Sequence, residues 1–155
     1  MKSGRRRLAK NPPSGRTSSY QRELDTPTPA APGPSATRVV ARRRGALVFL
    51  ELGEIWAFEA AERLTFVHSR HGTFDIDVSL AAIEASAGAG FTRVHRNWLV
   101  NSSQIKTLER SAGNTILFVG IAIGLDGLGI HVPVARTRAA SLRDELLANA
   151  IGVRR

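Results

Sequence analysis

Residues 91–101 read Phe-Thr-Arg-Val-His-Arg-Asn-Trp-Leu-Val-Asn. The first five residues have the β-branched and aromatic content that is typical of a strand. A second apolar run, Trp98-Leu99-Val100, follows and is most simply core. Arg96 and Asn97 separate the two runs, so we expect Arg96 at a strand end, from which a guanidinium can project from a rigid scaffold.

The chain before this stretch is made of short β-like pieces. Residues 46–51 and 55–59 read as a pair of strands separated by a short turn at 52–54. Residues 64–69 and 73–78 flank Arg70-His71-Gly72, and apolar residues alternate with Asp75 and Asp77 in the second piece. This period-2 pattern predicts a half-buried hairpin.

Two helices are expected, one inside the domain and one at its end. Ser79 can cap a short helix whose Leu80, Ile83 and Ala87 share one face, ended by residues 88–90. Thr137 or Ser141 can cap the second helix, with Leu142, Leu146 and Ala150 on one face and Gly152 at its end.

The remaining pieces predict further strands, at 91–95, near 105–108, at 115–119 and at 130–134. Pro133 cannot donate a hydrogen bond within a sheet, so its strand is expected at a sheet edge. The long, Gly-rich segment 121–129 predicts an irregular connection. The sum is an all-β domain with one short internal helix and a C-terminal helix.

The N-terminal residues have a different composition. Residues 1–37 are dominated by Arg, Pro, Ser, Thr and small residues, and we expect them to form a disordered basic arm. The domain is expected at 38–150 and a basic C-terminal tail at 151–155. All of the net charge of +9 falls within residues 1–44, leaving a neutral remainder. This predicts an arm that contacts a polyanion through phosphates, although a purely solubilising arm is the alternative.

Several classes of protein find no support in the sequence. The basic start is not followed by an apolar run, and no stretch reaches the roughly 20 apolar residues of a spanning helix, so we expect a cytoplasmic protein without a membrane partner. There is no cysteine, nucleophile elbow or phosphate-binding loop. His68 and His71 near Asp75 and Asp77 are explained by a turn better than by a metal site. We therefore expect no enzyme, no cofactor and no metal.

The segment 91–101 resembles the signature of LytTR DNA-binding domains, which runs F-x-R-x-H-R-S/N-x-L-V-N. Three further stretches agree in order and spacing, at 54–60, 73–83 and 132–136. The resemblance covers about 110 residues. It implies an elongated antiparallel β-sandwich of small sheets, with edge loops that enter successive major grooves of promoter DNA.

The resemblance also implies how such a protein works. LytTR domains bind direct repeats, as a possible dimer on DNA, and usually form the output part of bacterial response regulators. Residues 1–37 do not contain the receiver domain that usually precedes them, so we expect a stand-alone, nucleoid-associated regulator whose sensor or signalling partner is unknown. The DNA-binding residues implied or suggested for this chain are Arg63, Arg93, Arg96, Asn97, Arg136 and Arg138.

The chemistry of these residues suits DNA. An arginine at a strand end can pair bidentately with guanine O6 and N7. Arg136 and Arg138 flank a helix start that favours phosphate, although solvated arginines at a helix cap are the alternative. His95 and Asn101 are expected to be structural, His95 as a hydrogen-bonded strand residue and Asn101 as a tie for its own loop.

Two other functions stay open from the sequence. An RNA-binding β module would need aromatic side chains on an exposed strand face, and only Trp56, Phe58, Phe66 and Phe118 could serve. They read as core. A protein-interaction domain that has lost DNA binding is the other alternative, and the presence of Arg96 and Arg136 argues mildly against it.

Overall fold

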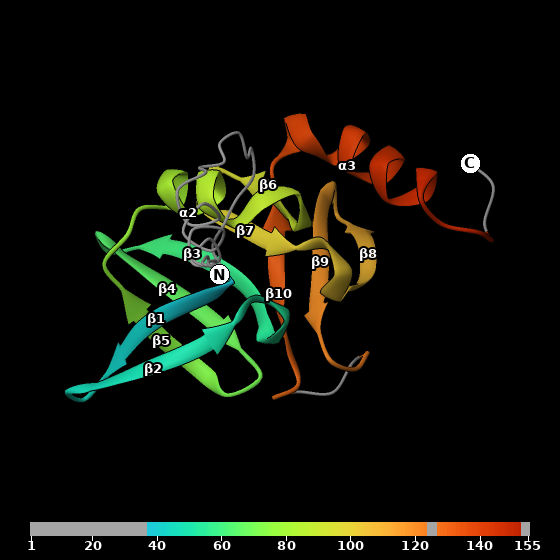
Figure 1. Cartoon of the computed structure of the whole chain (residues 1–155). Coiled ribbons are helices and arrows are strands. Elements are labelled where there is room, and N and C mark those ends of the chain that lie inside the picture. The colour runs from blue at the N-terminus through green and yellow to red at the C-terminus, as the bar shows by residue number, and fades with distance from the viewer. Residues whose placement is uncertain (1–36, 124–126, 153–155) are drawn as a thin grey trace, which may run out of the picture. The chain divides into compact units, whose positions relative to one another are not determined.

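The computed structural model describes residues 37–123 and 127–152 (Figure 1). The expected arm lies outside the described residues apart from Thr37, as do residues 153–155 of the expected tail. The strands are β1 (Arg38–Arg43), β2 (Ala46–Glu51), β3 (Ile55–Ala61), β4 (Leu64–Ser69), β5 (Gly72–Ile76), β6 (Phe91–His95), β7 (Trp98–Asn101), β8 (Ile105–Ser111), β9 (Asn114–Gly120) and β10 (Gly129–Val134). The helices are α2 (Leu80–Ala87) and α3 (Arg136–Ala148), with 3₁₀ turns at Leu52–Glu54, Gly88–Gly90 and Ser102–Gln104.

The strands form two antiparallel sheets. One has seven strands in the order β2-β1-β5-β4-β3-β7-β6, and the other has three in the order β10-β9-β8. The predicted fold class, mostly β with an internal and a C-terminal helix, is confirmed. The larger sheet is more continuous than a set of small sheets would be, although only the pair Arg42 and Asp75 joins β1 to β5. Pro133 lies on the edge strand β10, as predicted.

Strands β3, β7 and β6 separate two hydrophobic cores. Phe58, Phe91 and Leu99 face the first core, with residues of β1, β2, β4, β5 and α2. Val94 and Val100 face the second core, with residues of β9, β10 and α3. Figure 1 shows α2 on one side of β6 and β7, and α3 with the smaller sheet on the other. Both faces of this central layer are therefore buried.

The first hairpin differs from the prediction. β2 pairs with β1 and not with β3, and β1 was not predicted as a strand. Its arginines fold into the domain: the Arg42 guanidinium donates to Asp77 at 2.7 Å and to Asp75 at 3.3 Å, and Arg43 lies 5.6 Å from the ring centre of Phe74. The basic residues up to Arg44 therefore do not all belong to the arm. The folded domain includes some of them and is not neutral.

The internal helix and its neighbouring hairpin were predicted correctly. β4 pairs with β5 from Thr65 and Ile76 to Ser69 and Gly72. The Ser79 hydroxyl accepts from the backbone N–H of Ala82 at 3.2 Å and so caps α2. Leu80 and Ile83 are buried in the first core.

The start of α3 was predicted wrongly. Its N-cap is Ala135, with no side-chain cap, and neither Thr137 nor Ser141 fills this position. Leu142 is buried as expected, but Ala150 lies beyond the helix end and is exposed. Ala135 alone separates β10 from α3, and its carbonyl accepts the first helical bond, from the backbone N–H of Ala139 at 3.1 Å. The backbone N–H of Ala135 donates to the carbonyl of Val94 at 2.9 Å. This bond ties α3 to the end of β6.

The hairpin from β9 to β10 depends on Gly120. A Cβ there would lie 2.2 Å from the carbonyl oxygen of Leu128, an atom of the neighbouring backbone. We expect Gly120→Ala to lower the free energy of unfolding by about 1–3 kcal/mol, because this backbone must shift. Urea unfolding measures this loss of stability. Gly53→Ala is the matched control, since nothing lies within 4 Å of its Cβ position. Equal losses in both variants would contradict the close approach.

Candidate nucleic-acid interface

The turn between β6 and β7 is fixed by its own residues. The Arg93 guanidinium donates from Nε to the carbonyl of His95 at 3.1 Å and from Nη2 to the carbonyl of Arg96 at 2.9 Å. The backbone N–H of Asn97 donates to Nδ1 of His95 at 3.1 Å. Arg93 also donates to Glu84 of α2 at 2.7 Å. His95 is thus a structural residue, as expected. The guanidinium of Arg93 makes its hydrogen bonds within the protein.

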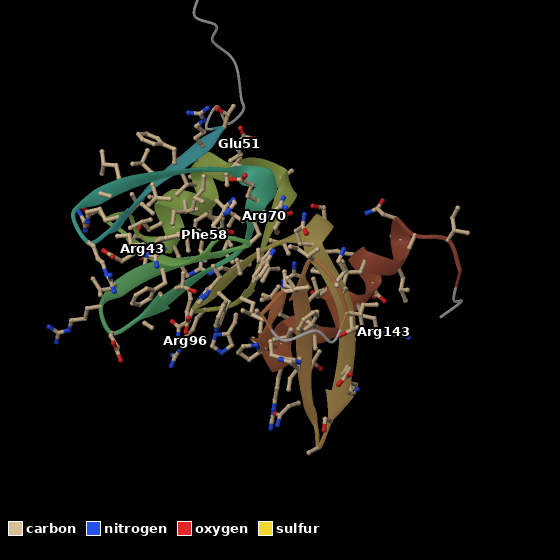
Figure 2. The ribbon with its side chains drawn as sticks, turned by 90° about the horizontal axis from the view of Figure 1, so that it is seen from below. Arg43, Glu51, Phe58, Arg70, Arg96 and Arg143 are labelled. Carbon is tan, nitrogen blue, oxygen red and sulfur yellow. The ribbon has the colours of Figure 1, made fainter. Side chains whose placement is uncertain are left out.

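Arg96 stands at the tip of this turn and is exposed (Figure 2). Its guanidinium has no hydrogen bond or ion pair within the described residues. Asn97 is half-buried, and its carbonyl accepts from the backbone N–H of Ala60 at 2.9 Å. The turn is therefore anchored to β3, while the guanidinium of Arg96 remains available to bind another molecule.

Arg63 lies in the neighbouring turn, between β3 and β4. Glu62 and Arg63 have φ values of 51° and 67°, in the left-handed region that residues other than glycine rarely adopt. The comparable turns at 44–45 and 112–113 have a glycine in their second position. A turn without glycine costs conformational energy, and such strain is often found at functional positions.

A cavity of about 640 Å³, here called the turn cavity, brings these two turns together. Arg63 and Asn97 both line it, with Glu62 and Asp77. The hydrogen bond and charge of Arg42 lower the pKa of Asp77, which keeps this side chain a carboxylate. Two acidic groups and one arginine leave the turn cavity without a basic character.

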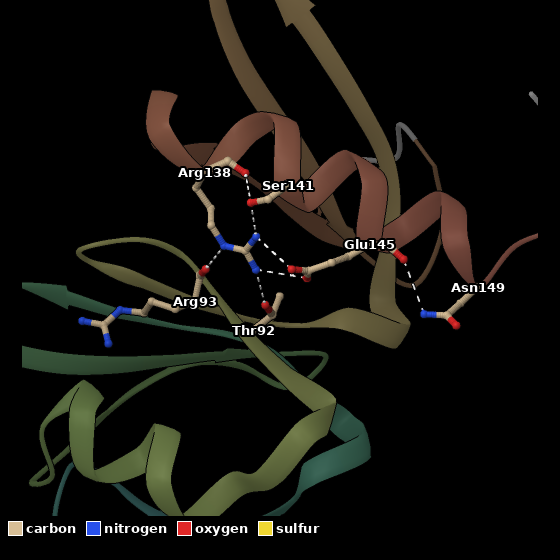
Figure 3. Close-up of polar contacts among 6 residues, drawn as sticks. All are labelled: Thr92, Arg93, Arg138, Ser141, Glu145 and Asn149. Carbon is tan, nitrogen blue, oxygen red and sulfur yellow. Dashed lines mark hydrogen bonds and ion pairs between the residues drawn. The ribbon is translucent and has the colours of Figure 1, made fainter. Parts of the chain in front are cut away.

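The first turn of α3 presents Arg136 and Arg138 very differently. Arg136 is the first helical residue, is exposed and has no partner among the described residues. Arg138 is only 25% exposed in its side chain. Its Nε donates to the carbonyl of Arg93 at 3.0 Å, and its other nitrogens donate to Thr92, Ser141 and Glu145 (Figure 3). The hydrogen bonds from Arg138 to Glu145, with the charge of Arg138, lower the pKa of Glu145.

The predicted residues thus fall into two groups. Arg63, Arg96 and Arg136 are exposed, and their side chains have no partner among the described residues. Asn97 follows Arg96 in the sequence and lines the turn cavity with Arg63. Arg93 and Arg138 are bonded internally and hold the turn and helix that carry Arg96 and Arg136. The motif on its own cannot separate the two groups. Arg93 bonds to the carbonyls of His95 and Arg96 only because the turn folds back on it, and the Arg138 partners Thr92 and Arg93 lie more than 40 residues away in sequence.

Sequence reasoning missed two arginines. Arg110 of β8 and Arg143 of α3 line a second cavity, the α3 groove, together with Thr115, Arg136 and Asp144. Its volume is about 790 Å³. Neither residue belongs to a motif, and only the packing of α3 on the smaller sheet brings them together.

Other features bear on the alternatives. Trp56, Phe58 and Phe118 are buried, so they are not free to stack on RNA bases. His68 bonds to Glu59 and Thr73 and stacks on Trp98 with ring centres 5.4 Å apart. Within the described ranges no three potential metal ligands cluster. In the same ranges no helix has both the length and the apolar character to cross a membrane.

Two curated proteins are similar to this chain in sequence. The chain is 32% identical over 118 residues to the positive alginate biosynthesis regulatory protein of Pseudomonas aeruginosa, covering 74% of this chain and 46% of the relative. It is 26% identical over 98 residues to the transcriptional regulatory protein YpdB of Escherichia coli, covering 63% of this chain and 38% of the relative. The chain therefore spans less than half the length of these relatives.

A solved structure has the same fold. It is the LytTr DNA-binding domain of a putative methyl-accepting/DNA response regulator from Bacillus cereus. The TM-score is 0.61 at 23% sequence identity, covering 73% of this chain and 98% of that domain. Residues 45–147 match the family described as the LytTr DNA-binding domain, a range that runs from the first hairpin to the end of α3. The chain belongs to this family.

Proposed function

We propose that this protein regulates bacterial transcription by binding a specific duplex DNA sequence in promoters. Arg96, Asn97 and Arg136 enter the major groove from the edge loops, and Arg63 contacts the same duplex from the neighbouring turn. The relatives are themselves named as regulators. A protein with this function acts in the cytoplasm, on the DNA of the nucleoid. Binding DNA requires no catalytic step.

One observation carries the proposal. Arg96 and Arg136 lie on either side of a single junction, where the backbone N–H of Ala135 donates to the carbonyl of Val94 at 2.9 Å. Both guanidiniums are exposed and without a partner in the described ranges, while the backbone under them is fixed. A rigid scaffold with free arginine forks is what bidentate recognition of guanine requires.

Arg93 and Arg138 have a supporting role in this proposal. Their guanidiniums are bonded to the carbonyls of Arg96 and Arg93 respectively. A base contact would require them to give up these bonds. They therefore position the DNA-contacting residues, and they are not proposed as contacts themselves.

The likeness to LytTR domains supports one arrangement of the protein on DNA. We propose that two copies of the domain bind direct repeats as a dimer on DNA, one copy to each repeat. A sensor or signalling partner supplies the input. DNase footprinting on the selected sites tests this arrangement, because direct repeats predict two protected segments with the same orientation.

Base reading by Arg96 and Arg136 is the central test. A cognate site is first selected from a pool of random duplexes with the full chain. We expect Arg96→Ala or Arg136→Ala to weaken binding to that site by about 1–3 kcal/mol, roughly 5- to 150-fold, and to weaken binding to random DNA much less. Fluorescence anisotropy on both duplexes measures the ratio.

Two controls keep the test clean. Thermal melting must show that each variant is folded, since an unfolded turn would imitate lost base reading. Arg70→Ala is the matched variant, because Arg70 is exposed and lies at the opposite end of β4 from Arg63. If both folded variants keep the full ratio of cognate to random affinity, base reading by these residues is wrong.

A further inference from the structure

The α3 groove is strongly basic where the turn cavity is not. Arg110, Arg136 and Arg143 face Asp144 around the groove, whereas Glu62 and Asp77 outnumber Arg63 in the turn cavity. Three arginines from two elements therefore surround one opening. Figure 2 shows Arg143 on α3 beside the smaller sheet. Of the two cavities, only the α3 groove is suited to an anion.

Three arginines and one threonine that line the α3 groove have unused hydrogen-bonding capacity. Arg110, Arg136 and Arg143 are exposed, and none of their guanidinium groups has a hydrogen bond or ion pair within residues 37–123 and 127–152. Thr115 is only 7% exposed, and its hydroxyl has no partner within the same ranges. A buried hydroxyl without a partner is unfavourable, so the groove presents a donor that a ligand would satisfy.

The chemistry that fits these groups is a phosphate. Arginine forks bind phosphate oxygens bidentately, and a hydroxyl donates readily to the same oxygens. The groove shares Arg136 with the proposed base-reading edge. A phosphate of the DNA backbone near a base read by Arg136 is therefore the anion that best fits a groove also lined by Arg110 and Arg143.

We infer that the α3 groove holds a backbone phosphate of the bound duplex through Arg110, Arg143 and Thr115. This contact adds affinity without adding sequence preference, because phosphates are alike at every base pair. The inference rests on the proposed function, and it extends the DNA contact from the edge loops to the outer side of α3.

Salt dependence of binding tests the inference with the full chain. We expect the double variant Arg110→Ala/Arg143→Ala to bind cognate and random duplexes more weakly by the same factor, roughly five-fold at about 0.15 M salt. The slope of log affinity against log salt should become shallower by about 1. Arg70→Ala should leave the slope unchanged. Both variants should melt like the wild type, because the substituted side chains are exposed.

Thr115→Val gives an independent readout, because it removes the hydroxyl while keeping the shape of the side chain. We expect it to weaken binding to both duplexes without lowering the melting temperature. A double variant that keeps the wild-type slope overturns the inference, even where Arg96→Ala still removes sequence preference. Loss of sequence preference in the double variant also overturns it, since the groove would then read bases.

A free phosphate compound is the competing source of the same chemistry. Inorganic phosphate or a mononucleotide is titrated against the wild type and the double variant by thermal shift. Stabilisation that requires Arg110 and Arg143, together with unchanged DNA binding in the double variant, assigns the groove to a small ligand and overturns the DNA contact. A wild type that binds no duplex would overturn the proposed function itself.

Discussion

Asn101→Ala is expected to lower the free energy of unfolding by about 2–4 kcal/mol, because it removes a buried amide that joins two loops. The Asn101 side chain donates to the carbonyls of Ile55 at 2.9 Å and Leu52 at 3.4 Å. Its oxygen accepts from the backbone N–H and the hydroxyl of Ser103 at 3.1 and 2.9 Å. Alanine leaves these groups without partners in a site that water reaches poorly.

Urea unfolding of the Asn101 variant measures this loss. Asn149→Ala is the matched control, because Asn149 is exposed and makes one bond, to the carbonyl of Glu145 at 3.4 Å. We expect the control to stay within about 0.5 kcal/mol of the wild type. Should Asn101→Ala also stay within that range, the last residue of the 91–101 motif would not be a structural tie.

Periodicity predicted the parts of the fold that have one buried face. The alternation from Phe74 to Ile76 gave the hairpin of β4 and β5, and Ser79 gave the start of α2. Strand β3 has both faces buried, with Trp56 and Phe58 in different cores. Its sequence could therefore show a strand without showing which strands it pairs with.

Strand β1 was missed because its arginines resemble those of the preceding segment. The charge count grouped Arg42 with the basic residues that precede the domain, but the fold pairs Arg42 with Asp75 and Asp77, more than 30 residues away. Such a charge pair is set by register between distant strands. Local sequence carries no sign of it.

The sequence named candidate residues for the site, but it did not separate exposed guanidinium groups from those that are bonded within the protein. The motif placed Arg93 and Arg96 three residues apart without distinguishing them. One guanidinium closes the turn and the other projects from it, because strand β6 is irregular between Arg93 and His95. Arg110 and Arg143 could not be predicted at all, since packing of α3 brings them together.

Arg138→Ala is expected to loosen the junction that carries Arg136. The Arg138 side chain bonds to the carbonyl of Arg93, to Thr92 and, through two nitrogens, to Glu145 at 3.1 Å each. Hydrogen bonds to charged groups contribute more than neutral ones. We expect a loss of about 1.5–3 kcal/mol in the free energy of unfolding. Cognate DNA affinity should fall as well, although Arg138 is not proposed to contact DNA.

The pH dependence separates this role from that of a DNA contact. Hydrogen bonding to Arg138 lowers the pKa of Glu145 from its usual value of 4.5, so the pair stabilises the fold above about pH 4.5 and loses this effect as pH falls through the lowered pKa. The gap in stability between wild type and Arg138→Ala should therefore narrow in acid. Arg143→Ala is the matched control on the same helix and should melt like the wild type at every pH. A gap that stays constant between pH 7 and pH 3 would show that Glu145 does not hold Arg138, and that α3 keeps its place at the end of β6 by other contacts.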